Sequence, residues 1–284
     1  MIATIALGLV LALPQEGQGT STDTTVTVRP GARLEMHNMA GDIEVKTWDR
    51  NAVRVQAEHS SRDHVEISYG GVVLRVGASG RRGPAHAVDY IITVPAAMDL
   101  NLSGNYGDIS VEGSTGRIVV ETVQGGVTVK GGRSLVTLHS VEGDVAASGV
   151  VGRLEINSTN GEATVDDVEG EVYVEGVNGD VTLSGIRSDN VNATTVNGDV
   201  IYRGTVRDDG QYRLSTHNGD ISVSVPGTTN ATVTVSTFSG DFESDFPVTL
   251  TGARQGKRFT FTLGSGRATM ELESFQGSIR LVRP

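Results

Sequence analysis

Residues 169–185 read EGEVYVEGVNGDVTLSG, and this stretch contains the pattern that decides the fold. Apolar and polar residues alternate on both sides of Asn178-Gly179-Asp180. Aligning all recurrences of this unit on its glycine gives ten anchor positions: Gly41, Gly107, Gly125, Gly143, Gly161, Gly179, Gly198, Gly219, Gly240 and Gly277. The spacing is eighteen residues from Gly107 through Gly179 and then nineteen, twenty-one and twenty-one. The chain is therefore an internal repeat of about 18–21 residues.

The columns around the anchor glycine indicate which residues face a core. The position two residues after the glycine is apolar in all ten copies, as at Val127 and Val181. The positions five and seven residues before it are also apolar, as at Val174 and Val172, with polar residues between them. Alternation with a period of two is typical of strands that bury one face. Val181 and its column are therefore predicted to point inward.

Two corners interrupt the alternation in each repeat. The phase changes three residues before the anchor, where small polar residues such as Ser140 and Ser158 stand. A second corner is marked by glycines six residues after their anchors: Gly113, Gly131, Gly149 and Gly185. Each repeat therefore reads as strand, corner, strand, corner.

This pattern predicts an all-β, single-chain parallel β-solenoid (a β-helix) with rungs of about 18–21 residues and antiparallel β caps. The competing interpretation is a meander of hairpins, because Asn-Gly pairs also mark hairpin turns. Near-identical residues would not need to recur in one column of a meander, whereas stacked rungs repeat each column every ~4.8 Å. The solenoid is favoured, and its coil is expected to be right-handed, as parallel crossovers usually are.

Four segments follow from this reading. Residues 1–20 are a signal peptide and linker, 21–99 an N-terminal rung with an antiparallel cap, 100–245 the regular solenoid, and 246–284 a C-terminal cap with the last rung. Strand-like runs at 53–58, 65–69, 72–76 and 88–94 build the first cap, with a hairpin turn at Tyr69-Gly70-Gly71-Val72. Runs at 246–250 and 258–263 build the second. Phenylalanines gather there and are expected to close the core: Phe238, Phe242, Phe246, Phe259, Phe261 and Phe275.

The recurrent Asn-Gly-Asp-Val/Ile units at 178–183, 197–200 and 218–223 resemble the "putative adhesin" family of bacterial domains of unknown function. The resemblance extends over residues 30–284. It implies an exported parallel β-solenoid with an adhesin-like role, and the family brings no established catalytic residues.

The N-terminus predicts export. Residues 2–13 read IATIALGLVLAL and are followed by Pro14 and a polar stretch. The run is shorter than the ~20 apolar residues that span a bilayer and fits the core of a secretory signal, with cleavage after Ala12 or within the next segment. No Lys or Arg precedes it, so a retained apolar strand is the alternative. No second apolar run follows, so we expect no transmembrane segment in the mature chain and a periplasmic, cell-surface or secreted location.

Charge and cysteine content exclude several classes of function. The net charge of −11 argues against nucleic acid as a partner, because phosphate binding needs a surplus of Lys and Arg. The chain has no cysteine, so disulfides, thiolate metal sites and cysteine nucleophiles are excluded.

An acidic column follows the anchor glycine, and it has two readings. Stacked carboxylates attract calcium, and Asp144, Asp180, Asp199 and Asp220 are the candidate ligands. The alternative is that each Asp accepts hydrogen bonds from backbone N–H groups of the turn, and this reading is favoured because calcium needs more oxygens than the neighbouring columns supply. No other cofactor is expected. The preceding Asn column (Asn160, Asn178, Asn197, Asn218) is expected to form a ladder of side-chain amides.

Catalysis is not expected. The six histidines show no metal-binding spacing, and no serine stands in a nucleophile elbow. Enzymes that cleave polysaccharides also use parallel β-helices, but they need paired carboxylates in a groove and aromatic platforms. This chain has one tryptophan, Trp48, and few aromatics expected to be exposed, mainly Tyr106, Tyr173 and Tyr202.

The sequence thus predicts a non-catalytic binding or scaffold protein at the cell envelope, with an adhesin-like mode of many weak contacts to an envelope or extracellular polymer or protein. The alternative is a periplasmic structural or envelope-stress component without an adhesive role. A polysaccharide-active enzyme is the third hypothesis. Calcium-dependent stabilisation is compatible with the first two.

Overall fold

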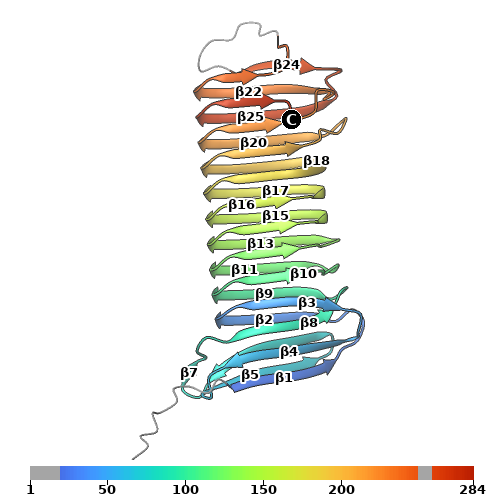
Figure 1. The fold of residues 1–284 in the computed structure, drawn as a ribbon, viewed down its shortest axis with the longest axis vertical. Coiled ribbons are helices and arrows are strands. Elements are labelled where there is room, and N and C mark those ends of the chain that lie inside the picture. The colour runs from blue at the N-terminus through green and yellow to red at the C-terminus, as the bar shows by residue number, and fades with distance from the viewer. Residues whose placement is uncertain (1–19, 249–257) are drawn as a thin grey trace, which may run out of the picture.

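The computed structural model describes residues 20–248 and 258–284, and within these ranges the chain forms 26 strands and no helix. The strands lie across a tall stack whose middle rungs follow one another in chain order, from green β9 to yellow β17 (Figure 1). The all-β prediction is confirmed. None of the described residues belongs to a helix long and apolar enough to cross a bilayer.

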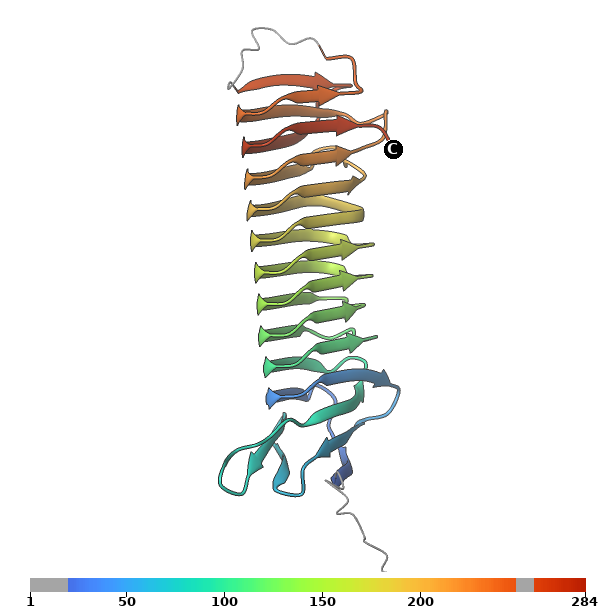
Figure 2. The ribbon, with the colours of Figure 1, turned by 60° about the vertical axis from the view of Figure 1, so that its left-hand side comes forward.

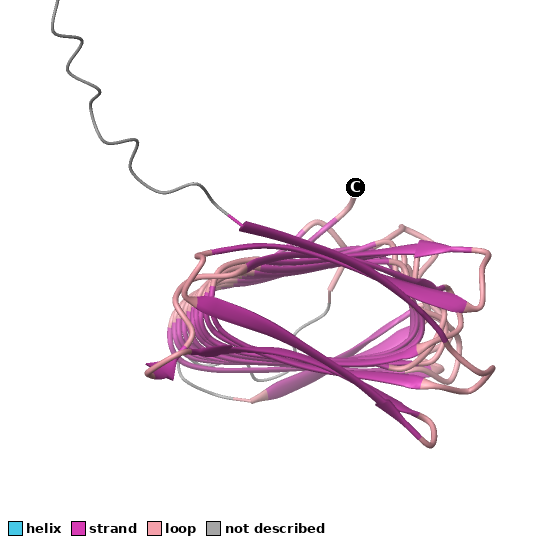
Figure 3. Ribbon diagram, turned by 90° about the horizontal axis from the view of Figure 1, so that it is seen from below, coloured by secondary structure: helices cyan, strands magenta, loops and turns pink. Residues whose placement is uncertain are grey.

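Two opposite faces make up the middle of the stack, as the view along its axis shows (Figure 3). Short strands form face A: β10 (Ile109–Glu112), β12 (Val127–Lys130), β14 (Val145–Ser148), β16 (Ala163–Asp166), β19 (Val200–Gly204) and β21 (Ile221–Ser224). Longer strands form face B: β9 (Asp99–Tyr106), β11 (Ile118–Gln124), β13 (Leu135–Glu142), β15 (Val151–Asn160), β17 (Glu169–Asn178) and β20 (Gln211–Asn218). One strand, β18 (Val181–Asn197), contributes to both faces.

Successive rungs pair in parallel and in register. On face A, Val127 pairs with Val145 and Val181 with Val200, and on face B Leu138 pairs with Ile156. The hairpin meander is therefore wrong for the middle of the chain, because its neighbouring strands would run antiparallel. The parallel coil is visible in side view, while its handedness stays a prediction (Figure 2).

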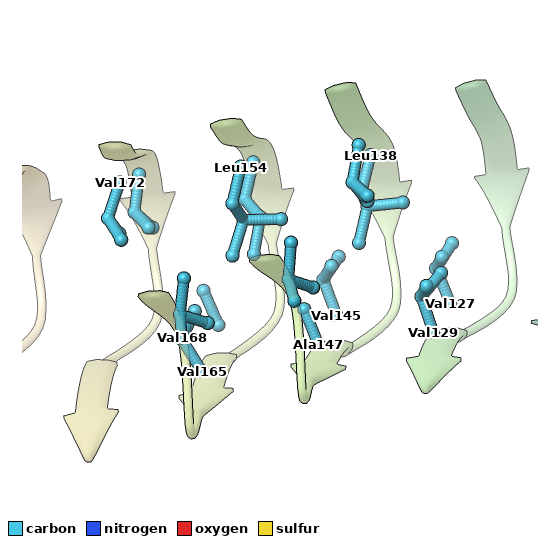
Figure 4. Close-up of a cluster of buried hydrophobic side chains, with 14 of the residues drawn as sticks. Val127, Val129, Leu138, Val145, Ala147, Leu154, Val165, Val168 and Val172 are labelled. Atoms are coloured by element: carbon cyan, nitrogen blue, oxygen red, sulfur yellow. The ribbon is translucent and has the colours of Figure 1, made fainter. Parts of the chain in front are cut away.

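The core lies between the two faces and is filled by the predicted columns. Val181 is 1% exposed, so its inward orientation is confirmed. Side chains from face A, such as Val145 and Val165, meet those from face B, such as Leu138 and Leu154 (Figure 4). Burying a Val or Leu side chain contributes about 1.5–3 kcal/mol, so each rung is stabilised mainly by the rungs beside it.

The N-terminal end combines parallel and antiparallel pairing. Its strands are β1 (Thr20–Thr27), β2 (Arg33–Ala40), β3 (Ile43–Trp48), β4 (Ala52–His59), β5 (Asp63–Gly70), β6 (Val73–Gly80), β7 (Gly83–Pro84) and β8 (Asp89–Pro95). The hairpin is confirmed, since β5 and β6 are antiparallel with Gly70 opposite Val73. The rung of β2 and β3 lies inside the stack, between β6 and β8 on one side and β9 and β10 on the other.

The C-terminal end has the same kind of insertion. Its strands are β22 (Ala231–Ser239), β23 (Phe242–Ser244), β24 (Phe259–Leu263), β25 (Ala268–Gln276) and β26 (Ile279–Val282). The rung of β25 and β26 lies between the rungs of β20–β21 and β22–β23 and pairs in parallel with both. The order of stacking therefore differs from the order of the chain, as Figure 1 shows for β20, β25 and β22. Antiparallel β24 then covers β22.

Two predicted segments fall on residues that the structure does not describe. The leader within residues 1–20 lies almost wholly outside the described ranges, and so does the end of the predicted run 246–250.

Candidate binding surface

Each anchor glycine stands at a corner where the backbone of successive rungs touches. We call this the Gly-Asp corner and define it as the ten hexapeptides that run from four residues before each anchor to one residue after it. Gly179 has φ +139°, and a Cβ there would overlap the carbonyl oxygen of Gly161 in the rung below. The same overlap recurs at Gly198 against Gly179. A side chain is therefore excluded both by the backbone conformation and by space.

The buried position of this corner is occupied by small polar side chains, as the phase change indicated. Ser158 Oγ donates to the carbonyl oxygen of Gly161 at 3.1 Å, and Ser274 Oγ donates to that of Gly219 at 2.8 Å. These hydroxyls satisfy carbonyl groups that would otherwise be left unpaired at a buried turn.

The acidic column connects neighbouring rungs through the backbone. Oδ1 of Asp144 accepts from the N–H of Glu162 at 2.9 Å, and Oδ1 of Asp180 accepts from that of Asp199 at 2.8 Å. Oδ1 of Asp199 accepts from the N–H of Asp220 at 2.8 Å. Oδ1 of Asp220 in turn accepts from the N–H of Ser278 at 2.8 Å. Among the described residues, no three His, Cys, Asp or Glu side chains gather in a way that could hold a metal ion. Calcium binding by the remaining oxygens stays a hypothesis, with a test given below.

The Asn column forms a continuous chain of amide hydrogen bonds on the outer side of the corner. Asn178 Nδ2 donates to Asn160 Oδ1 at 2.8 Å, Asn197 Nδ2 to Asn178 Oδ1 at 2.8 Å, and Asn218 Nδ2 to Asn197 Oδ1 at 2.7 Å. Every donor points toward the earlier rung, so the ladder has one direction.

Next to the Asn column lies a row of exposed apolar side chains that the sequence reasoning missed. It occupies the position two residues before each anchor, and we call it the apolar ridge. Exposed members include Val123 (49%), Val196 (43%) and Phe238 (65%). Seven of the exposed large hydrophobic residues stand in this one column: Met39, Val123, Val141, Val177, Val196, Phe275 and Phe238. Asn105, Thr159 and His217 complete it. The signal was present in the sequence as a further apolar column, but it lies beyond the phase change and so faces outward.

Stacked rings form the C-terminal part of the ridge. The rings of His217 and Phe275 are 4.7 Å apart and nearly parallel, and Phe275 and Phe238 are 4.8 Å apart. The expectation that all six phenylalanines close the core is therefore wrong for Phe275 and Phe238, which lie outside it. Phe246 and Phe261 are buried, and Phe242 and Phe259 pack partly against them.

Face B carries a separate slot of about 390 Å³ beside Tyr173, Asn192 and Arg213. Tyr173 is fixed by Asn190, whose Nδ2 lies 2.6 Å from the tyrosine oxygen, and by the Arg153 guanidinium 4.5 Å above its ring. The slot's lining includes one carboxylate, Glu271, and this group is paired with Arg258 at 3.5 Å. Glycoside hydrolysis uses two carboxylates, so the slot lacks the pair that this chemistry needs.

Two other candidate residues, Tyr202 and His86, make structural contacts. Tyr202, expected to be exposed, is completely buried because it stands four residues after its anchor, on the inward phase. Its hydroxyl donates to the Thr205 carbonyl oxygen at 2.9 Å, and burial raises its pKa. His86 contacts Asp63 at 3.1 Å. Burial would raise the pKa of the Asp63 carboxyl, but its hydrogen bonds with His86 outweigh that effect and lower it.

A family model described as Toastrack DUF4097 matches residues 20–282. No curated protein matches the chain. A structure described as a "putative adhesin" from Parabacteroides distasonis is similar, with 10% identity, a TM-score of 0.51, and coverage of 94% of this chain and 98% of that one. A "putative adhesin" from Parabacteroides merdae has 13% identity, a TM-score of 0.47, and coverage of 94% and 98%. At 10% identity, the likeness to the Parabacteroides distasonis structure concerns the fold alone.

Proposed function

The chain belongs to the Toastrack DUF4097 family, and from this premise we propose that it is an exported, non-catalytic binding protein of the cell envelope whose binding surface is the apolar ridge. The observation that carries the proposal is the gathering of exposed large hydrophobic residues in one column. Eight of the eleven stand at the Gly-Asp corner, when Tyr106 is counted with the seven of the ridge. Contiguous exposed apolar surface rimmed by polar groups is typical of interaction sites, whereas isolated exposed apolar residues need no explanation.

The shape of the surface indicates an elongated partner. The ridge crosses ten rungs, and at ~4.8 Å between rungs it extends for about 43 Å. Seven of the ten rungs offer one apolar side chain each, so affinity would come from many contacts in series, in the manner of an adhesin. The description of a solved neighbour as a "putative adhesin" is consistent with this mode.

Binding to cells and isolated envelopes of the source organism tests the ridge. The labelled protein is compared with Val141→Thr/Val177→Thr/Val196→Thr, a variant that keeps β-branched side chains and imitates Thr159 in the same column. We expect binding to fall at least tenfold, with an unchanged melting temperature. Val151→Thr is the control, because Val151 is equally exposed (45%) but lies away from the ridge. Equal binding by all three proteins would overturn the proposed use of the ridge.

The location is tested by antibody labelling of an epitope-tagged copy on intact and on permeabilised cells. Labelling of intact cells is the expected result and would place the ridge where adhesion can occur. Labelling only after permeabilisation would favour the alternative, a periplasmic structural or envelope-stress component without an adhesive role.

A further inference from the structure

The charges of the chain are distributed unevenly between the Gly-Asp corner and everything else. The sequence has 34 Asp and Glu against 23 Lys and Arg, a net charge of −11. The ten corner hexapeptides contain no Lys or Arg, and they contain twelve of the 34 acidic residues: Asp42, Asp108, Glu121, Glu142, Asp144, Glu162, Glu175, Asp180, Asp199, Asp220, Asp241 and Glu273. The remaining 22 acidic residues are balanced by the 23 basic ones, so the corner holds the whole net charge.

These corner carboxylates are also mostly without a cationic partner. Only Asp220, 3.7 Å from Arg280, and Glu273, 4.0 Å from Arg213, approach a described Lys or Arg. Ion pairs elsewhere are more numerous, and several are shorter, such as Arg54–Asp23 at 2.6 Å and Arg153–Glu155 at 2.6 Å. In most Asp residues of the acidic column, as in Asp180, one carboxylate oxygen accepts a hydrogen bond from the backbone of the next rung. The second oxygen can interact with a cation from a binding partner.

From this arrangement we infer that the occupant of the apolar ridge is a cationic amphipathic segment of polypeptide, an inference that rests on the proposed use of the ridge for binding. The ridge supplies apolar contact, and the flanking carboxylates require positive charge at the same spacing. Nucleic acid and anionic lipid headgroups are repelled by the corner, and a metal ion or polyamine leaves the apolar row uncovered. A segment with Lys or Arg beside apolar residues satisfies both.

The spacing of the ridge suits an amphipathic helix laid along it. One helical turn rises 5.4 Å and presents an apolar residue about once per turn, close to the ~4.8 Å between rungs. A helix of about 18 residues is ~27 Å long and would cover five or six rungs. The stacked rings of His217, Phe275 and Phe238 offer the largest apolar contact at one end.

Three labelled synthetic peptides of about 18 residues test the inference, and fluorescence anisotropy measures their affinity for the unaltered protein. The first places Leu on one helical face and Lys on the other, the second has Glu for Lys, and the third scrambles the Leu/Lys order. We expect the first to bind at least tenfold more tightly than the others and to weaken at least tenfold from 50 to 500 mM salt, because exposed charges are screened.

The corner itself is tested by Asp144→Asn/Glu162→Gln/Asp180→Asn/Asp199→Asn. Asn keeps the oxygen that accepts the backbone N–H, so the fold should be retained, and we expect the Leu/Lys peptide to bind at least tenfold more weakly. The control removes the same charge elsewhere, through Glu35→Gln, Glu155→Gln, Glu171→Gln and Asp208→Asn, and should change the Kd less than twofold.

Three outcomes would overturn the inference: equal losses in the two sets of variants, tight binding of the Leu/Glu peptide, or no binding of the Leu/Lys peptide to the unaltered protein. If envelope binding still depends on Val141, Val177 and Val196 in those cases, the proposed function stands and only the partner's chemistry is wrong. If the ridge variant binds both envelopes and the peptide normally, the proposed function fails with it.

Discussion

The two corners of each rung are made by the same repeat, yet only one of them keeps its length. At the Gly-Asp corner all ten copies connect a face B strand to a face A strand with the same number of residues. At the opposite corner the connection from a face A strand to the next face B strand varies from a continuous strand in β18, through two residues at 149–150, to the whole segments 49–98 and 245–267. Both end structures and the looser spacings of nineteen and twenty-one therefore arise at the opposite corner.

The physical reason for the difference is the contact between rungs. At the Gly-Asp corner, three columns are in direct contact with a neighbouring rung: the glycine approaches a carbonyl of the earlier rung, the Asp accepts from an N–H of the later rung, and the Asn bonds to another amide. The opposite corner also buries a residue in several rungs, such as Val150 and Val168, but its longer connections extend into solvent. At residues 207–209, for example, the chain is exposed, and an added residue there displaces no buried side chain. A repeat protein can thus vary in one corner while the other maintains the register.

A single-residue insertion should give the largest contrast between the corners. One Ser inserted between Asn178 and Gly179 would move Val181 and Leu183 to the outer phase, and losing their burial costs about 3–6 kcal/mol. One Ser inserted between Asp208 and Asp209, in the exposed turn of the opposite corner, should cost less than about 1 kcal/mol. Chemical denaturation of both variants measures the difference. Equal losses would mean that the register is not held by the Gly-Asp corner.

Alanine at the glycines should give the next largest difference. Gly179→Ala combines a disfavoured φ with an overlap on the Gly161 carbonyl, and we expect a loss of about 3 kcal/mol or more. Gly149→Ala, at φ +66° with no atom closer than 3.9 Å, should lose only the conformational cost of about 1 kcal/mol. Thermal unfolding of the two variants provides the comparison, and a larger loss at Gly149 would contradict it.

Variants in the acidic column distinguish hydrogen bonding to the backbone from binding of a cation. Asp180→Ala should lose about 1–2 kcal/mol because the N–H of Asp199 loses its acceptor, whereas Asp180→Asn keeps the oxygen and should stay within about 0.5 kcal/mol. We also expect the melting temperature of the unaltered protein to be indifferent to EDTA. A fall on chelation, together with equal losses for Ala and Asn, would instead establish calcium at the corner.

The smallest effect is expected in the amide ladder. Asn197 makes two ladder bonds, and Asn197→Ala should cost about 1 kcal/mol in free energy of unfolding. The amide of Asn218 makes only the terminal ladder bond, to Asn197, so Asn218→Ala should lower the free energy of unfolding about half as much. If both replacements lower the free energy of unfolding equally, the loss does not depend on the number of ladder hydrogen bonds removed.

Much of the fold could be predicted from the sequence, because stacked rungs place residues of the same type at the same position of each repeat. The glycine spacing, the inward valines such as Val181 and the hairpin at Gly70-Gly71 all follow from local patterns. Tyr202 was recoverable too, since it shares the inward phase of Leu183 and Val223. The apolar ridge is harder to recognise, because it stands directly after the phase change, where the alternation no longer separates the inner from the outer side. The position of the Gly277 rung could not be read at all, since spacing along the chain says nothing about which rung lies beside which.

The placement of β25 and β26 between rungs that precede them in the chain has a consequence for biosynthesis. Residues 268–282 emerge from the ribosome after both of the rungs that they separate. Growth of the stack by adding one rung at a time can therefore proceed only as far as β21. The rung of β22 and β23 stays without its parallel partners until β25 and β26 have been synthesised. A chain halted before Ala268 would present the edges of β20 and β21 to whatever strand it met, so completion of synthesis, and not its progress, closes this end of the molecule.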